Sequence, residues 1–328
     1  MLYTKKYLSS AFPVVSLLIC YGTSIADYPQ PRPGDPLQTL TADLLDRFEK
    51  GKISFNQEIT VEGGLGPIFN QTSCGSCHNN PVGGAGSQTV TRFGFIGKKG
   101  GFDPLAELGG SLRQAEAISD ECAEIVPPEA NVTSLRVTNS ALAFGLIEAI
   151  SDTALLANRD AQPEAQRGDA HMVPSFEGPT DPLKVGRFGW KAQVATVLTF
   201  SADAAQNEMG LSNRFLPFDN APNGDEELLD NCDSVADPED APDAEGYEFI
   251  DRVTDFQRFL APPPQTPRSG MSGEIIFNSI GCNVCHTPEF TTADDPEIEQ
   301  QLRNQVIRVY GDCLLHDMGL GGDGIVQG

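Results

Sequence analysis

One short pattern, repeated, carries the residues best suited to chemistry. Cys-x-x-Cys-His occurs twice, at Cys74, Cys77 and His78 and again at Cys282, Cys285 and His286. On a short helix, cysteines three residues apart lie on one face, where both thiols can form thioether bonds to one haem. The adjacent imidazole can then bind the iron as an axial ligand. The motifs therefore predict two covalently bound haem c groups, with His78 and His286 as iron ligands.

Two other readings of these cysteines stay open. A Cys-x-x-Cys pair can be a redox dithiol, and two pairs can form a zinc site. A four-thiolate zinc site would leave each following His without a role. A thioredoxin-like dithiol favours a strand-to-helix setting, whereas Cys74 follows a Gly/Pro loop and precedes Asn79–Gly84. Haem attachment is the reading that uses every residue of both motifs.

The N-terminus predicts export. Lys5 and Lys6 precede an apolar run from Tyr7 to about Cys20, and a small-residue stretch then ends at Ala26. This order is typical of a signal peptide over residues 1–26, with cleavage before Asp27. The run is too short for a stable membrane span, and Cys20 resembles a lipoprotein signal only weakly. We expect a periplasmic protein, which agrees with haem attachment outside the cytoplasm.

Composition narrows the choice of partners. The 328-residue chain has a net charge of −24, which argues against nucleic acid because phosphates would be repelled. The charge would suit a small soluble electron-transfer protein, such as a cytochrome c, with a basic docking face. With 33 Gly and 24 Pro, the chain should form short helices joined by ordered loops. The oligomeric state has no signal in the sequence.

Three of the eight cysteines remain once the signal and the two motifs are set aside: Cys122, Cys232 and Cys313. Cys122 and Cys232 each lie in a loop-like acidic segment, so in an oxidising compartment they are the favoured disulfide pair. Cys313 would then be the odd thiol.

Periodicity predicts several elements before the second motif. Leucines and Phe48 at helical spacing from residue 37 predict a helix that stops near Gly51, and residues 89–96 favour a strand. The apolar stretch 135–150 reads as one packed helix, in which Glu148 is either at the edge or a buried carboxylate that needs a partner. A further helix is expected from Val194.

The acidic segment 225–251 holds twelve Asp and Glu and no Lys or Arg. We expect a solvated, mobile insert; a bound Ca²⁺ is conceivable there, but no regular ligand spacing supports it. A helix over 249–260 should follow, and Pro262–Pro264 read as a linker. A short helix over 272–280 then leads into the second motif.

The spacing Phe69-x4-Cys74 returns as Phe277-x4-Cys282, which favours two related haem modules. Further iron ligands can be sought near each. His171 or Met172 could cap one haem, and His316 or Met318 the other, since a Met ligand raises the potential of an electron store. His316 could instead brace a loop or a haem propionate.

Four segments, in this order, resemble a known group: Leu65–Asn70, Gly145–Ile150, Gly186–Ala192 and Leu314–Gly319. They are similar to the bacterial di-haem oxidoreductases once labelled thiol oxidoreductases, which are related to di-haem cytochrome c peroxidases. The likeness runs from about residue 37 to the end. It implies a mainly α protein with much loop and a few short strands. Two cytochrome c-like domains, one haem each, would span residues 27–261 and 265–328.

The resemblance also implies chemistry. A peroxidase would need a group that takes a proton from one peroxide oxygen and returns it to the other. By comparison with the family that group is Glu208, with Asp203 as a nearby alternative. Phe200 stands where peroxidase relatives carry a Gln, which counts against a direct assignment of peroxidase activity. A pure electron-transfer cytochrome without a substrate site is therefore the alternative. Relatives usually continue beyond the equivalent of Gly328, so we expect the second domain to be incomplete.

Overall fold

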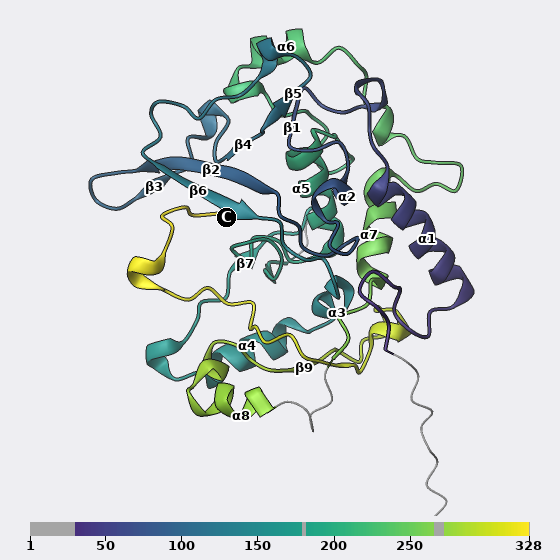
Figure 1. Ribbon diagram of the computed structural model, residues 1–328, viewed down its shortest axis with the longest axis vertical. Helices are drawn as coiled ribbons and strands as arrows, with labels where there is room; N and C mark the ends of the chain where they lie inside the picture. The colour runs from purple at the N-terminus through teal and green to yellow at the C-terminus, as the bar shows by residue number, and fades with distance from the viewer. Residues whose placement is uncertain (1–29, 179–181, 266–271, 328) are drawn as a thin grey trace, which may run out of the picture. The chain divides into compact units, whose positions relative to one another are not determined.

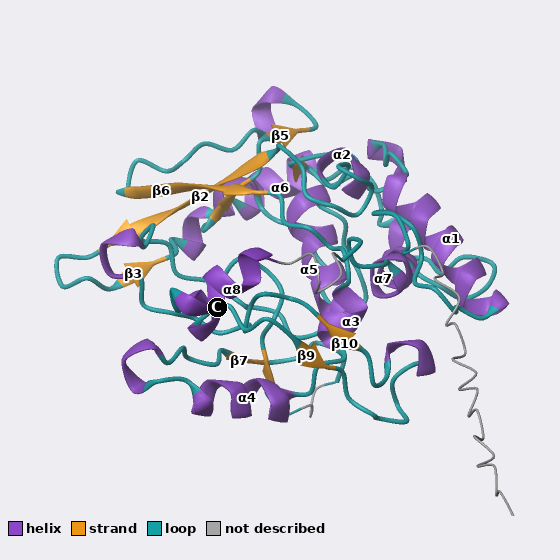
Figure 2. Cartoon of the chain, turned by 60° about the horizontal axis from the view of Figure 1, so that its bottom comes forward, coloured by secondary structure: helices purple, strands orange, loops and turns teal. Residues whose placement is uncertain are grey.

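Two helices, α1 (Ala42–Asn56) and α7 (Phe249–Phe259), lie side by side next to the first motif (Figures 1 and 2). The computed structural model describes residues 30–178, 182–265 and 272–327. The other α-helices described are α2 (Cys74–Cys77), α3 (Phe144–Glu148), α4 (Asp152–Ala161), α5 (Val197–Met209), α6 (Glu226–Cys232) and α8 (Ser272–Ser279). The predicted signal peptide lies outside the described residues.

The strands are short and pair antiparallel. They are β1 (Ile68–Phe69), β2 (Thr89–Ile96), β3 (Phe102–Asp103), β4 (Leu112–Arg113), β5 (Glu116–Ala117), β6 (Val132–Val137), β7 (Met172–Val173), β8 (Lys184–Val185), β9 (Phe290–Thr291) and β10 (Val306–Ile307). The largest sheet has β2 at its centre, paired with β3, β4 and β6. The other sheets are two-stranded pairs: β1 with β5, β7 with β8, and β9 with β10.

Helix α1 continues past Gly51, so the predicted stop there is wrong. A Cβ at Gly51 would lie 2.3 Å from the carbonyl oxygen of Arg252 on α7, so the glycine allows the two helices to cross closely. The rings of Phe55 and Phe256 meet across this contact with centroids 4.7 Å apart. Here a glycine serves packing, and the helix tolerates its lower propensity.

The predicted strand over 89–96 is confirmed as β2, but the predicted helix over 135–150 is wrong. Its first residues belong to β6, which pairs with β2 along six residues and alternates between half-buried and exposed positions. Only α3 is helical, and it follows Ala143 in the left-handed conformation, with φ 68°. The apolar run thus joins a strand to a five-residue helix across a turn.

The acidic segment 225–251 is tied to the body of the molecule. Cys232 forms the predicted disulfide with Cys122, with an S–S distance of 2.01 Å, and Cys313 is a free cysteine. Arg252 on α7 donates to Asp243 at 2.5 Å and to Glu245 at 2.9 Å. The segment therefore contains helix α6 and fixed ion pairs, which the prediction of one mobile insert missed.

The C-terminal residues share a core with the middle of the chain. Leu146, Ile150 and Leu155 from the α3–α4 region pack with Phe290 and with residues Leu302 and Ile307. The predicted helix before the second motif is α8. Phe277 lies in α8 whereas Phe69 lies in strand β1, so their equal spacing to cysteine does not mark equivalent elements. The proposed domain boundary stays a prediction. No helix among the described residues is long and apolar enough to cross a membrane.

Candidate functional site

The first motif forms a single helical turn that presents both thiols and the imidazole. Ser73 caps α2 by accepting a hydrogen bond from the Ser76 amide at 3.2 Å. The Nδ1–H of His78 donates to the carbonyl of Gly84 at 3.1 Å, and the ring has a second hydrogen bond with the backbone of Asn139. Burial lowers the pKa of His78 and so keeps the ring neutral. This is the state in which imidazole binds a metal.

The C-terminal end of α5 is joined to the loop before the first motif. The carbonyl of Glu208 accepts from the Asn70 amide at 2.8 Å, and that of Met209 accepts from the Gly66 amide at 3.2 Å. The helix ends at Gly210, whose φ is 65°. A Cβ on Gly66 would lie 2.2 Å from the Gly210 oxygen, so the contact needs glycine. These bonds fix the motif relative to α5.

One face of α5 opens into a cavity beside the motif. Phe200, Asp203, Ala204, Asn207 and Glu208 recur at helical spacing, and each is half-buried while their neighbours Ser201, Ala202, Ala205, Gln206 and Met209 are buried. Cys74, Cys77, His78 and Trp190 line the same cavity. The space between them is about 110 Å³, so side chains would have to move apart to admit a porphyrin.

Two half-buried carboxyl groups, those of Asp203 and Glu208, lie in this cavity. Asn70 Nδ2 donates to Oε2 of Glu208 at 2.7 Å. Burial raises the pKa of Glu208, against the opposing effects of the Asn70 hydrogen bond and the Arg92 charge, while Asp203 raises it further. Burial also raises the pKa of Asp203, to which Asn207 Nδ2 donates at 3.1 Å. The environment thus favours the protonated form of both carboxyl groups, and each is chemically able to exchange a proton.

Unpartnered guanidinium atoms support a fit to haem at this site. Nε of Arg92, and Nε and Nη2 of Arg136, are buried without a hydrogen-bond partner, and both residues line the cavity. Arg136 is ion-paired with Asp323 through Nη1, so only its other two nitrogens and Nε of Arg92 are open to a further anionic partner. A haem has two propionates, and the adjoining Cys74, Cys77 and His78 supply its sulfur and nitrogen anchors. The donor set therefore fits a haem.

Burial disfavours the thiolate form of the two cysteines of the first motif. Burial raises the pKa of Cys74 to about 12 and that of Cys77 to about 11. Zinc binding and thiol exchange both need the thiolate. Across residues 30–178, 182–265 and 272–327, no three or more His, Cys, Asp or Glu side chains group as a metal site.

The second motif repeats the histidine arrangement of the first. The Nδ1–H of His286 donates to the Tyr310 carbonyl at 3.0 Å, as that of His78 does to the Gly84 carbonyl. A phenylalanine edge also meets each imidazole, Phe277 with centroids 6.3 Å from His286 and Phe55 with centroids 6.0 Å from His78. The structural counterpart of Phe277 is therefore Phe55, 19 residues before Cys74, which the sequence spacing did not indicate.

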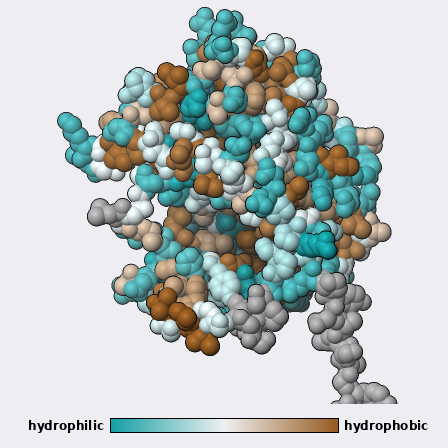
Figure 3. Space-filling model, in the orientation of Figure 1, coloured by the Kyte–Doolittle hydropathy of each residue, from teal (hydrophilic) through white to brown (hydrophobic). Residues whose placement is uncertain are grey.

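The surroundings of the second motif also suit a large apolar group. Ile275, Ile276 and Ile280 are exposed, Ile275 by 74%, and apolar side chains gather over α8 in the space-filling view (Figure 3). The Tyr310 hydroxyl is buried without a partner. A haem anchored at Cys282 and Cys285 would offer apolar surface to such isoleucines and an acceptor to such a hydroxyl.

The sequence-based candidates for distal ligands lie in different settings. Both ring nitrogens of His316 are hydrogen-bonded: Nδ1 bonds the Gln166 carbonyl at 3.1 Å and Nε2 bonds Asp312 at 2.8 Å. Met318 is 72% exposed. His171 Nδ1 bonds the Lys191 carbonyl at 3.2 Å, and the neighbouring Met172 is exposed. None of the four lines the first cavity. Their role as ligands stays a prediction.

Sequence reasoning missed Arg92, Arg136 and Asn70. A signal existed for Arg92, because it follows Val90 at the two-residue period of β2, which points both side chains to one face. Asn70 stands in the segment Leu65–Asn70 that carries the family resemblance. Arg136 lies on β6, within the apolar stretch for which the sequence pattern predicts a helix.

The two motifs share one arrangement, in which the histidine bonds a backbone carbonyl through Nδ1 and meets the edge of a phenylalanine ring. A family model described as "Di-haem oxidoreductase, putative peroxidase" matches residues 119–328, the greater part of the chain. The chain belongs to this family and is a di-haem oxidoreductase, as the resemblance implied. The match includes α5 and the second motif, and the first motif precedes it. No curated protein and no solved structure matches the chain.

Proposed function

We propose that this protein is an exported di-haem c-type oxidoreductase that reduces H₂O₂ or a related oxidant. Electrons would come from a small soluble electron-transfer protein with a basic docking face, which the net charge of −24 would attract. The observation that carries the proposal is the position of Glu208. Its carboxyl group lies in the same cavity as Cys74, Cys77 and His78.

The residues of that cavity indicate which steps a bound haem would supply and which steps the side chains would supply. A bound haem would supply the iron and the electron-storage chemistry that protein side chains lack. The reduction H₂O₂ + 2H⁺ + 2e⁻ → 2H₂O requires protons to reach the leaving oxygen. Asn70 holds Oε2 of Glu208, which leaves Oε1 to accept a proton from one peroxide oxygen and return it to the other. Asp203, one turn earlier on α5, is the second carboxyl able to relay a proton.

Phe200 shapes the cavity without bonding to the oxidant. It packs against Phe144, with ring centroids 5.5 Å apart, and against Phe188, at 6.2 Å. Held in this aromatic cluster, it lines the cavity with an apolar ring that offers no hydrogen bond. Orientation of a peroxide would therefore depend on the polar side chains of the same cavity, among them Glu208, Asp203 and Arg92.

The decisive variant is Glu208→Gln, tested as haem-loaded protein with H₂O₂ and a reduced cytochrome c. We expect turnover to fall by about 10²- to 10⁴-fold, as for loss of a general acid–base group. Haem content should not change, because Gln keeps the size and the hydrogen-bonding capacity of the side chain. Glu116→Gln, an exposed substitution on β5, is the matched control and should keep full activity.

A pure electron-transfer cytochrome is the rival function. In that case both haems would be six-coordinate and low-spin, and millimolar H₂O₂ would leave the reduced protein unchanged. Turnover with high-spin haem favours the enzyme. Export can be checked separately, by fractionating cells and following haem-stained protein in the periplasmic fraction.

A further inference from the structure

A second, larger cavity adjoins the first. Its volume is about 750 Å³, within the range of small-molecule binding sites. The two cavities share Arg92, Gln193, Asp203 and Asn207 as lining residues. A molecule in the larger cavity would therefore lie next to the side of α5 that carries Glu208. Peroxide, about the size of two water molecules of ~30 Å³ each, needs far less space.

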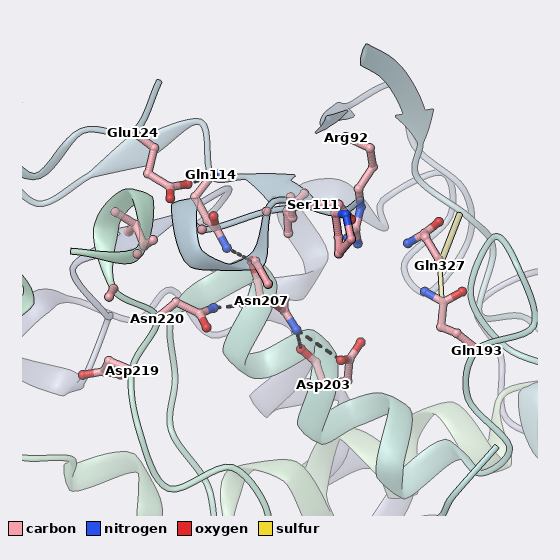
Figure 4. A pocket seen from close by; sticks show the side chains of 18 of the residues that line it. Arg92, Ser111, Gln114, Glu124, Gln193, Asp203, Asn207, Asp219, Asn220 and Gln327 are labelled. Carbon is pink, nitrogen blue, oxygen red and sulfur yellow. Dashed lines mark hydrogen bonds between the residues drawn. The ribbon is translucent and has the colours of Figure 1, made fainter. Parts of the chain in front are cut away.

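The polar side chains follow the cavity from end to end (Figure 4). Asp203 and Asn207 project from α5 near the middle, Arg92 and Gln193 lie towards one end, and Glu124 lies towards the other. Several of these groups are held in place. Gln114 Nε2 donates to the Asn207 carbonyl at 3.1 Å, and Glu124 accepts from the Gln114 amide at 2.7 Å. The cavity wall is thus preorganised.

The lining combines carboxylates with aromatic rings. Among the described residues that line it, four are acidic and one is a cation. The acidic side chains are Glu124, Asp203, Asp219 and Glu226; the aromatic ones are Phe102, Phe176 and Phe218. Phenyl faces attract cations through their quadrupole, and carboxylates attract them by charge. Both features favour a positively charged guest with an apolar body.

The single lining cation does not reverse this preference. The Arg92 guanidinium lies over the Trp190 ring at 5.5 Å and interacts with the charges of Asp203 and Glu208, at the end nearest the motif. At that end of the cavity the guanidinium therefore lies close to two carboxyl groups. Glu226, on the first turn of α6, lies in the lining well away in sequence from that pair. Asp219 and Glu226 thus add negative charge to the lining, whereas burial raises the pKa of Glu124 and favours its neutral form.

We propose that the 750 Å³ cavity is a binding site for a small organic cation, a protonated amine with an aromatic or aliphatic body, beside the first haem motif. The site extends the proposed function by giving the protein a second ligand besides the oxidant. Binding alone does not depend on peroxide turnover, so the two proposals can fail separately.

The test uses haem-loaded protein without peroxide and three probes of matched shape: benzylammonium, benzyl alcohol and benzoate. Isothermal titration calorimetry at low salt should show saturable binding of benzylammonium. We expect benzyl alcohol to bind at least ~10-fold more weakly, since it lacks the charge. Benzoate should bind more weakly still, because its carboxylate would face like charges.

Two variants locate the site. Ala106→Trp places a large ring in the lining and should abolish benzylammonium binding, with circular dichroism as the check on folding. Glu226→Gln removes one lining charge from an exposed helix position and should weaken binding about 3- to 10-fold. Glu227→Gln, the next residue on the same exposed turn but outside the lining, is the matched control and should bind like the parent.

Equal binding of benzoate and benzylammonium would overturn the charge argument. Unchanged benzylammonium binding to folded Ala106→Trp protein would mean that the amine binds outside this cavity, and it would also refute the proposal. A protein that turns over peroxide but binds no amine loses only this inference. If the protein binds the amine but does not react with peroxide, only the proposed peroxidase function is refuted.

Discussion

At the scale of single residues, the proposed activity depends on the protonation state of Glu208, which three polar neighbours influence. Asn70 and Arg92 favour its ionised form, while burial and the nearby Asp203 favour the protonated one, and the raised pKa shows that burial dominates. To accept a proton from peroxide, Glu208 must be ionised. Turnover should therefore fall as the pH drops through the raised pKa of this group.

The substitution Asp203→Asn should shift the acid limb of the pH–activity profile, the fall of turnover at low pH, in a defined direction. Removing the neighbouring negative charge, and leaving Arg92 to act on Glu208 alone, lowers the pKa of Glu208. The acid limb of kcat/KM for H₂O₂ should then move to lower pH. Asp230→Asn, an exposed change on α6, should leave the profile in place. An acid limb that stays fixed or moves upward in Asp203→Asn would contradict the assignment.

At the scale of elements, the contact between the haem loop and the end of α5 is the joint that places the motif. Gly66→Ala would force a Cβ into the Gly210 carbonyl region, so the loop must separate from the helix. We expect a loss of about 2 kcal/mol or more in the free energy of unfolding, with reduced haem incorporation at Cys74 and Cys77. Chemical denaturation and a haem stain measure both.

Gly101→Ala is the control for that substitution, because a Cβ there meets nothing within 4 Å. It should change stability by no more than about 0.5 kcal/mol. If Gly66→Ala behaves like Gly101→Ala, the close approach of loop and helix is not a constraint in solution.

The disulfide is a second contact that holds secondary-structure elements together. Cys122 and Cys232 are 110 residues apart, and the bond fastens α6 to the turn before Ala123. Replacing both with Ser should lower the free energy of unfolding by about 2–4 kcal/mol, mainly because the unfolded chain regains freedom. Urea unfolding of the Ser/Ser variant, compared with parent protein with and without reductant, checks this. Equal stability of all three would contradict it.

How far the sequence could go is clearest from α5 and β6. Phe200, Asp203 and Glu208 could be placed on one helix from spacing and family resemblance, and the structure puts them on one face. The strand β6 was misread because its apolar residues adjoin those of α3, and the chain reversal at Ala143 has no glycine to mark it. Arg92 and Arg136 reach the cavity from paired strands, and such pairing is a long-range property that local pattern does not encode.

At the scale of the whole molecule, charge and burial act together on stability. Burial raises the pKa of Glu124, Glu148, Asp203 and Glu208, so each contributes stability that is present below its unfolded pKa and lost as pH rises through its folded value. The net charge of −24 adds repulsion in the same direction.

Carboxyl groups with lowered pKa values have the opposite effect, and they set the lower end of the pH range in which the fold is most stable. Arg252 helps to hold the pKa of Asp243 at about 2, so that carboxyl contributes stability above its unfolded pKa and loses it as pH falls towards 2. The melting temperature should therefore be highest near pH ~5 and decline on both sides. A scan from pH 3 to 9 measures it, and a melting temperature that rises steadily from pH 5 to 8 would contradict the balance of charges.

The most direct test is the intact mass of mature protein, purified after export and denatured before measurement. The mass should exceed that of the polypeptide by two haem groups, and Cys282→Ala with Cys285→Ala should remove one of them. A polypeptide mass with no porphyrin added would contradict covalent attachment at both motifs, and with it the assignment of His78 and His286 as iron ligands.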